Sequence, residues 1–159
     1  VEDTGGVCFV PAFTGLGAPH WKAGARGEIT GITRATRAAH IVRAGLEATA
    51  FQTRDLLTAF AADGAPVEVL RVDGGMAAND WLLQSIADIC NRPVERPDCI
   101  EMTAPGAAAR PGIQLGWTSA AAWGARKAEG RTFKPKMDRP TRMALIKGWR
   151  RALDQTLSA

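Results

Sequence analysis

The sequence lacks any long apolar run, and none approaches the roughly 20 residues that a membrane-spanning helix needs. We therefore expect no membrane partner. The chain opens on an acidic and polar stretch, residues 1–6, which does not have the pattern of a signal peptide. It also lacks an initiator methionine, which indicates a polypeptide that begins further upstream.

Metal-ligand and disulfide patterns are also missing. The three cysteines, Cys8, Cys90 and Cys99, are an odd number without C-x-x-C spacing, which argues against a zinc site or a disulfide framework. Reduced thiols in a cytoplasmic protein are the expected state. The two histidines, His20 and His40, form no H-E-x-x-H or similar ligand pattern. We expect no metal site in this chain.

The net charge of +4 is unevenly distributed. Residues 110–159 carry 11 Lys and Arg against 3 Asp and Glu, whereas residues 1–109 carry 9 against 13. A basic segment can bind nucleic acid, and such binding would depend strongly on salt. Here the charges surround an apolar helical stripe and few aromatic residues are placed to stack on bases. We therefore expect a solvated helix face and no nucleic-acid partner.

Alternating patterns of apolar and turn residues predict an α/β layered domain without repeats or low-complexity segments. We expect one domain over residues 1–159, with few strands for a closed fold, which indicates sheet partners upstream. Short strands are expected at 7–13, 27–33, 67–72 and 94–96, the last as an edge strand ended by Pro97. Helices are expected at 38–62, from the turn at Asp73 to about Cys90, and at 103–109, 119–128 and 141–157.

Apolar residues at helical spacing predict the buried faces of three of these helices. In the first, the predicted face is Val42, Leu46, Ala50, Thr53, Leu57 and Phe60. In the second, the apolar positions are Trp81, Leu82, Ile86 and Ile89, and in the last they are Leu145, Trp149, Leu153 and Leu157.

The most informative local pattern is a short apolar strand that ends in the turn Asp73-Gly74-Gly75, followed by a helix with Asn79 in its first turn. Glycines let a ligand approach the main chain without a Cβ in the way. Free N–H groups at a helix start favour an anionic or polar group. Ligands of open α/β sheets gather at the carboxyl ends of strands, and this turn is such an end.

A purely structural interpretation of this turn stays open. Asp-Gly-Gly is a common turn, and the amide of Asn79 can point inward to cap the helix as well as outward to a base. The sequence contains neither the G-x-x-x-x-G-K-[ST] phosphate loop nor the G-x-G-x-x-G dinucleotide pattern. A nucleotide site here must therefore be of another kind.

Several longer stretches resemble glycerol kinases, which are FGGY carbohydrate kinases. Residues 11–21 resemble the P-A-F-x-G-L-x-A-P-x-W segment of glycerol kinases. Residues 27–32 and 40–47 resemble the second FGGY signature, and residues 50–55 and 71–79 are similar to the sequence that follows it in glycerol kinases. The resemblance covers nearly the whole chain to about residue 109 and is weaker beyond it.

The resemblance implies an actin-like (ribonuclease-H-like) ATPase fold, with this chain as the C-terminal FGGY domain, incomplete at its N-terminal side. Family members hold ATP mainly on this domain and the polyol mainly on the other. By matching position, Gly75 and Asn79 are implied to contact the adenosine of ATP, with Asp73 and Gly74 shaping the turn. The loop at 19–21 and the helix around Glu47 are interpreted as scaffold.

The implied reaction converts glycerol and ATP to sn-glycerol 3-phosphate and ADP, in the cytoplasm, by an enzyme that forms homo-oligomers when intact. The catalytic aspartate, the glycerol ligands, the Mg²⁺ ligands and the β/γ-phosphate loops belong to family segments upstream of Val1. Phosphoryl transfer needs an in-line nucleophile with a base in reach. We therefore expect no catalytic residue in these 159 residues and no activity from them alone.

Residues 103–112 depart from the family, which has a T-A-x-G-A-A-x-x-A-G helix there. Pro105 falls in the first helical turn and is tolerated, whereas Pro111 removes a helix hydrogen bond at a cost of roughly 3 kcal/mol. Arg110 places a charge where an apolar residue is usual. We expect a short, kinked or displaced helix, with nucleotide binding at risk.

Two alternatives to a glycerol kinase domain stay open. Another FGGY kinase, acting on a sugar or sugar acid, is disfavoured because the sequences at 11–21 and 71–79 resemble those of glycerol kinases. A non-catalytic remnant is favoured by the absent upstream half and by Pro105, Arg110 and Pro111.

Overall fold

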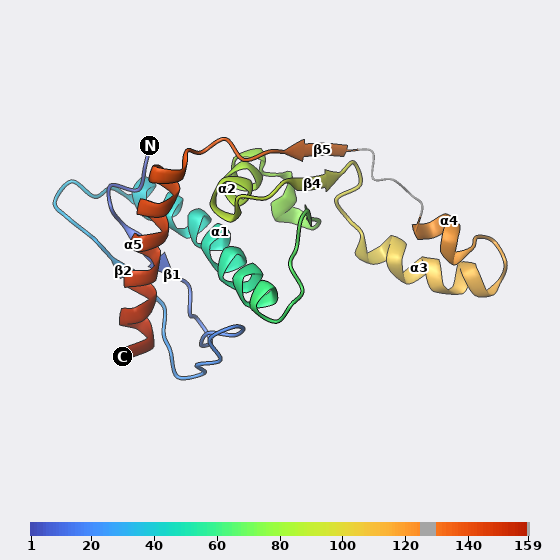
Figure 1. Cartoon of the computed structure of the whole chain (residues 1–159), viewed down its shortest axis with the longest axis horizontal. Coiled ribbons are helices and arrows are strands. Elements are labelled where there is room, and N and C mark those ends of the chain that lie inside the picture. Colours follow the sequence, from blue (N-terminus) through green and yellow to red (C-terminus); the bar gives the residue numbers. More distant parts are fainter. Residues whose placement is uncertain (125–129, 159) are drawn as a thin grey trace.

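The computed structural model describes residues 1–124 and 130–158 and confirms an α/β fold (Figure 1). The strands are β1 (Cys8–Val10), β2 (Glu28–Thr30), β3 (Leu70–Arg71), β4 (Val94–Pro97) and β5 (Gly130–Phe133). The helices are α1 (Ala38–Ala62), α2 (Asp80–Cys90), α3 (Thr103–Gln114), α4 (Ala120–Gly124) and α5 (Arg139–Ser158), with a 3₁₀ turn, η1 (Gly75–Ala78), before α2.

The strands form two small sheets. β1 and β2 pair antiparallel, with Phe9 opposite Ile29. In the other sheet β3 runs parallel to β4, and β4 runs antiparallel to β5, with Val94 opposite Phe133. The prediction of an edge strand at 94–96 was therefore wrong, because β4 lies between two neighbours. The missed partner, β5, reads Gly-Arg-Thr-Phe, and a single apolar residue gives no alternating pattern.

Helix α1 begins and ends at the predicted residues. At its start the backbone N–H of Arg37 donates to Nδ1 of His40 at 3.0 Å, while the N–H of His40 donates to the carbonyl of Arg37 at 2.9 Å. At its end the N–H of Asp63 donates to the carbonyl of Ala59, and Gly64 follows with φ of +80°. That left-handed conformation favours glycine, so Gly64 turns the chain out of the helix.

The buried face of α1 matches the predicted one only in part: Ala50 is buried as predicted, but both ends of the face differ. Val42 and Phe60 are 64% and 42% exposed, whereas Ala44, Ala48 and Phe51 are buried. The helix packs against α2 and β1, and alanines let these backbones approach closely. A count of large apolar residues therefore selected the wrong side of the helix at both of its ends.

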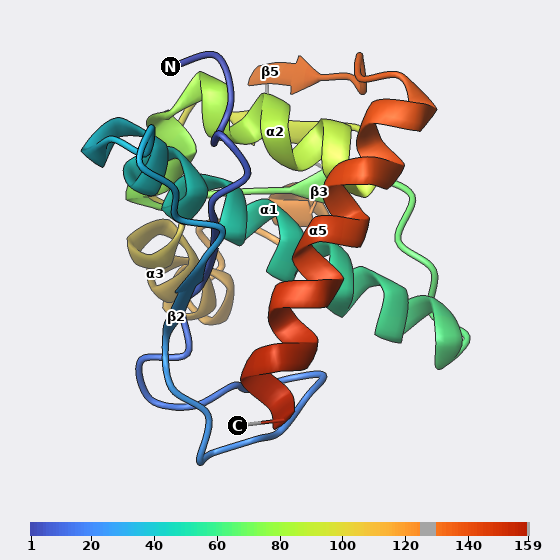
Figure 2. The ribbon, with the colours of Figure 1, turned by 90° about the vertical axis from the view of Figure 1, so that its left-hand side faces the viewer.

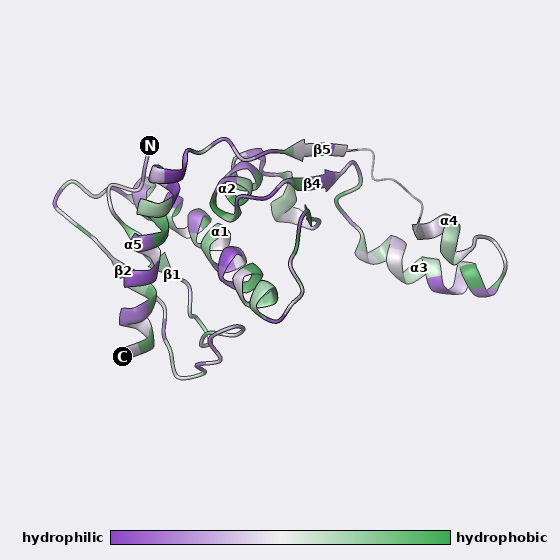
Figure 3. Cartoon of the chain, in the orientation of Figure 1, coloured by the Kyte–Doolittle hydropathy of each residue, from purple (hydrophilic) through white to green (hydrophobic). Residues whose placement is uncertain are grey.

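Helix α5 crosses α1 and closes the core (Figure 2). The indole ring of Trp149 stacks on Phe51 with centroids 5.2 Å apart. Trp149 and Leu153 are buried and their stripe partners Leu145 and Leu157 are half-buried, which confirms the predicted face. Hydrophilic and hydrophobic residues alternate along α5 in Figure 3, as expected of a helix with one buried side.

Helices α3 and α4 lie to one side of the other elements (Figure 1). The prediction that the first of them extends only through Ala109 was wrong, because α3 continues past Pro111 to Gln114. Pro111 has no N–H to donate to the carbonyl of Ala107, four residues before it. The carbonyl of Pro111 still accepts from the N–H of Leu115 at 2.9 Å, so the helix continues. Of the helix predicted at 119–128, residues 120–124 are helical, Ser119 directly precedes them, and residues 125–128 lie outside the described residues.

Candidate functional site

The candidate site is the turn that follows β3. The N–H of Val72 donates to the carbonyl of Glu95 at 3.0 Å, so pairing with β4 continues one residue beyond the strand itself. Asp73, Gly74 and Gly75 then leave the sheet at its carboxyl edge. This is the edge at which parallel α/β sheets present ligand-binding turns.

Gly74 has a backbone conformation that few other residues adopt. Its φ of 87° and ψ of 173° fall in a region used almost only by glycine. Its N–H donates to the carbonyl of Ile100 at 2.6 Å, and its carbonyl accepts from the N–H of Ala77 at 2.9 Å. The turn is therefore fixed on both sides, to the segment that leads into α3 and to η1.

Gly75 begins η1 and is exposed. A Cβ built on it would meet nothing within 4 Å, so the space before this residue is open. The first N–H groups of a helical turn have no partner within it. Exposed main-chain donors and open space together suit a ligand that approaches the backbone.

Asn79 lies between η1 and α2 and caps α2. Its side-chain Oδ1 accepts from the N–H of Leu82 at 3.1 Å, so the inward orientation is the one adopted. The prediction that one helix runs from the Asp73 turn to Cys90 was wrong in detail, because η1 comes first and α2 starts at Asp80. With Oδ1 in the cap, the amide Nδ2 group of this exposed residue remains as a donor.

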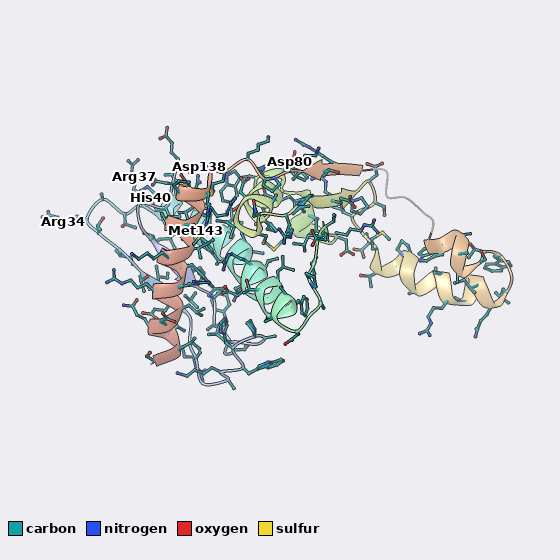
Figure 4. The ribbon with its side chains drawn as sticks, viewed as in Figure 1. Arg34, Arg37, His40, Asp80, Asp138 and Met143 are labelled. Atoms are coloured by element: carbon teal, nitrogen blue, oxygen red, sulfur yellow. The ribbon has the colours of Figure 1, made fainter. Side chains whose placement is uncertain are left out.

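A charged cluster that the sequence did not predict holds this region in place. One guanidinium N–H group of Arg96 donates to the carbonyl of Ala77 at 3.0 Å and to Oδ1 of Asp80 at 2.6 Å. Arg131 pairs with the other carboxylate oxygen of Asp80. Asp80 lies beside β5 in Figure 4. The cluster joins η1 and the start of α2 to β4 and β5. In the sequence, the only sign of this cluster is Asp80, an acidic residue in the first turn of α2.

The turn has exposed apolar neighbours. Met76, within η1, is 56% exposed, and Met102, directly before α3, is 39% exposed. Arg110 and Pro111 on α3 are both exposed. The described residues thus present a polar backbone turn followed at once by the exposed thioether of Met76, and such a side chain adapts to flat apolar groups.

The loop at 11–21 ends in a half-buried network. Nε2 of His20 lies 3.8 Å from Oδ2 of Asp55, and that oxygen accepts from the indole N–H of Trp149 at 2.6 Å. Glu47 pairs with Arg43 at 2.9 Å on the same helix. The contacts of Asp55 join the loop, α1 and α5, whereas the Glu47–Arg43 pair lies within α1.

The thiols are free, and the acidic groups form no metal-binding cluster among the described residues. Cys8, Cys90 and Cys99 are free. Burial raises the pKa of Cys8 to about 11 and that of Cys90 to about 12, so both stay protonated near neutral pH. No three His, Cys, Asp or Glu side chains within residues 1–124 and 130–158 gather so that they could hold a metal ion. No helix there is long and apolar enough to cross a membrane.

Comparison with known sequences gives one family. The model of the FGGY family of carbohydrate kinases, C-terminal domain, matches residues 1–115. Glycerol kinases from Rhodospirillum centenum and Coxiella burnetii are 52% and 50% identical over 99% of this chain, and one from Carboxydothermus hydrogenoformans is 52% identical over 96%. The chain spans 32%, 32% and 31% of these relatives, about a third of their length.

Comparison with solved structures agrees with the family found from the sequence. A crystal structure of Plasmodium falciparum glycerol kinase with ADP matches with a TM-score of 0.84 at 38% identity, over 99% of this chain and 32% of that one. A ligand-bound xylulose kinase from Lactobacillus acidophilus matches with a TM-score of 0.77 at 22% identity, over 98% of this chain and 32% of that one, and shows the fold alone. These likenesses confirm the expected actin-like ATPase fold.

Proposed function

This chain belongs to the FGGY family of carbohydrate kinases, and we propose that it supplies the ATP-binding side of a glycerol kinase. The proposed reaction transfers the γ-phosphoryl group of ATP to glycerol, giving sn-glycerol 3-phosphate and ADP. The observation that carries the proposal is identity near 50% with glycerol kinases along nearly the whole chain. A cytoplasmic location, homo-oligomers, and one partial domain over residues 1–159 belong to the same proposal.

We place the adenosine of ATP against the turn after β3. The backbone of Gly75 and the Nδ2 group of Asn79 offer donors on one exposed side of the turn, while Gly74 and Asp73 set its shape. Three observations support this assignment: the glycine-only conformation of Gly74, the open space before Gly75, and the cap that fixes Asn79. The exposed side chain of Met76 is placed to contact the base.

Catalysis is assigned to residues outside this segment. Phosphoryl transfer requires in-line positioning of the glycerol hydroxyl and a base within hydrogen-bond reach. No acidic cluster among the described residues fits Mg²⁺, so the ligands of that ion are expected elsewhere in the whole enzyme. The isolated chain is accordingly proposed to be inactive.

A graft tests this function. Residues 1–159 replace the segment that they match in the Rhodospirillum centenum glycerol kinase, and glycerol-dependent ADP formation is measured. We expect activity from the graft and none from the chain alone or from the relative without its segment. A folded graft that binds glycerol but forms no ADP would contradict the proposal.

A non-catalytic remnant is the second candidate, and Pro111 inside α3 is the observation that favours it. A second graft carrying Pro111→Ala separates the two. If only this second graft forms ADP, the chain as it stands is a remnant. If both grafts do, α3 with its proline is compatible with a working enzyme.

A further inference from the structure

A cavity lies at the opposite edge of the parallel strand pair from the Asp73 turn. Its volume is about 300 Å³, and it opens between the C-terminal half of α1, the end of α2 and the N-terminal half of α5. Val67, just before β3, and Arg92, just before β4, are in its wall. Because these residues precede the strands, the cavity is at their amino ends, away from the candidate nucleotide site.

The charged side chains that line this cavity all have one sign. Arg54 comes from α1, Arg92 from the α2–β4 connection and Arg142 from α5, and no Asp or Glu lines it. Arg150, on α5, is close enough to act on Arg54 electrostatically. Arginine side chains from three separate elements therefore line one hollow.

Few of these charges are neutralised by carboxylates. Arg92 donates to the carbonyls of Val67 at 3.0 Å and Asn91 at 3.1 Å. Arg142 donates to the carbonyls of Met137 at 3.3 Å and Asp88 at 3.5 Å. Within the described part of the chain neither arginine has a carboxylate oxygen within 4.0 Å.

Arg54 has one carboxylate neighbour. Nη1 of Arg54 lies 3.7 Å from Oδ1 of Asp55, whose other oxygen accepts from Trp149. Burial lowers the pKa of Arg54, and the guanidinium groups of Arg150 and Arg142 lower it further. The repulsion between these arginines is thus only partly offset.

The ends of two helices supply some negative potential at the cavity, but not enough to balance the positive charge of the arginines. The carbonyl end of α2 carries roughly half an elementary negative charge, and that of α1 a similar amount. Arg150 adds a fourth guanidinium group, and the carboxylate of Asp138 acts on Arg142 electrostatically. Against four positive charges, the two helix ends, Asp55 and Asp138 together supply roughly three negative charges. About one positive charge therefore remains in excess.

We propose that this cavity binds a small anion: a phosphate or carboxylate group attached to a compact apolar body. Guanidinium forks recognise both groups by paired, charge-assisted hydrogen bonds. Leu57, Ile89 and Ile146 also line the cavity and provide the apolar contact. Met143, labelled on α5 in Figure 4, lines it too and adapts to the shape of a ligand. The proposal does not rest on the kinase assignment.

Titration of the ¹⁵N-labelled chain tests it, with phenyl phosphate and benzoate as the two anionic probes and neutral benzamide as the matched control. We expect saturable shifts of amide signals at Val67, Arg92 and Arg142 with at least one anion and none with benzamide. If phenyl phosphate alone binds, the site selects phosphate, and if benzoate alone binds, it selects carboxylate. No saturable shift with either anion, or shifts confined to residues 73–79, would overturn the proposal.

Two variants and a control complete the test. Arg54→Gln and Arg142→Gln should each weaken binding of the anion ~10-fold or more, since each removes a charge-assisted contact. Arg54→Lys keeps the positive charge and should weaken binding of the anion less than Arg54→Gln does. Arg34, in the loop before α1 (Figure 4), is exposed and lies away from the cavity, so Arg34→Gln should leave binding unchanged. An equal loss in the Arg34 variant would reduce the effect to net charge and refute the site.

Discussion

The indole N–H of Trp149 donates to a carboxylate oxygen of Asp55 across 2.6 Å, which joins α5 to α1 inside the core. Trp149 is 2% exposed and stacks on Phe51, so its indole ring is buried. The contact is one of those that join the basic C-terminal segment to the rest of the domain, together with the β4–β5 pairing and the bond between Thr156 and Glu28.

Asp55→Ala should lower the free energy of unfolding by about 1–3 kcal/mol, because it leaves a buried N–H without an acceptor. Urea unfolding followed by tryptophan fluorescence measures the change. Asp154→Ala, at an exposed position of α5, is the control and should change stability by less than about 0.5 kcal/mol. Equal effects of the two substitutions would show that the indole contact contributes nothing.

Asp138 gives the start of α5 a dependence on pH. Its carboxylate accepts from the N–H of Thr141 at 2.9 Å and from the hydroxyl of Thr141 at 2.7 Å, and these bonds lower its pKa, with the N–H as the largest cause. A lowered folded-state pKa stabilises the fold fully above the ordinary Asp pKa, and this contribution is lost as pH falls through the lowered value.

Asp138→Ala should therefore destabilise the chain near neutral pH, and its difference from the wild type should shrink as the pH falls below about 3.9. Thermal melts at a series of pH values measure this difference. A gap that stays constant over the series would exclude a role for the ionised carboxylate.

Gly74→Ala should destabilise the chain by about 1–3 kcal/mol, since alanine must adopt a conformation that is nearly exclusive to glycine. A Cβ at this position meets no atom within 4 Å, so the cost comes from the backbone alone. Gly75→Ala is the matched control, because its Cβ is also unobstructed and its φ is not positive. Chemical unfolding of both variants should show a loss for the first only.

Pro111→Ala should stabilise α3 by up to about 3 kcal/mol, because it restores a helix donor to the carbonyl of Ala107. Hydrogen exchange of the α3 amides is the suitable measurement, since this helix lies to one side of the core. Arg110 is exposed, so the companion substitution Arg110→Leu buries nothing and should add no protection. Unchanged exchange in the Pro111 variant would mean that the proline costs the helix nothing.

Local sequence patterns predicted the elements that carry their own signals. Helix α1 follows from its periodicity and from Gly64 and Pro66 after it, and the final helix follows from the stripe around Trp149. The elements that depend on tertiary partners were missed. β5 has one apolar residue and exists through its pairing with β4, and α1 buries Ala44 and Ala48 because neighbouring backbones come close.

The same distinction holds for the candidate site: its local turn was predictable from the sequence, and its long-range contacts were not. The turn at Asp73, Gly74 and Gly75 was visible because glycines after an apolar strand are a local signal. The side-chain cluster of Arg96, Asp80 and Arg131 was not, because its members lie up to 51 positions apart. The Arg54, Arg92 and Arg142 cavity was hidden for the same reason, since only the fold brings these arginines together.

The functional proposal depends on where the adenine nucleotide binds. A crystal structure of the graft with ADP measures it directly. We predict the adenosine against the turn after β3, with a polar atom within about 3 Å of the Gly75 backbone or of Nδ2 of Asn79. Adenosine bound away from residues 73–79, in a graft with ADP at full occupancy, would contradict the account.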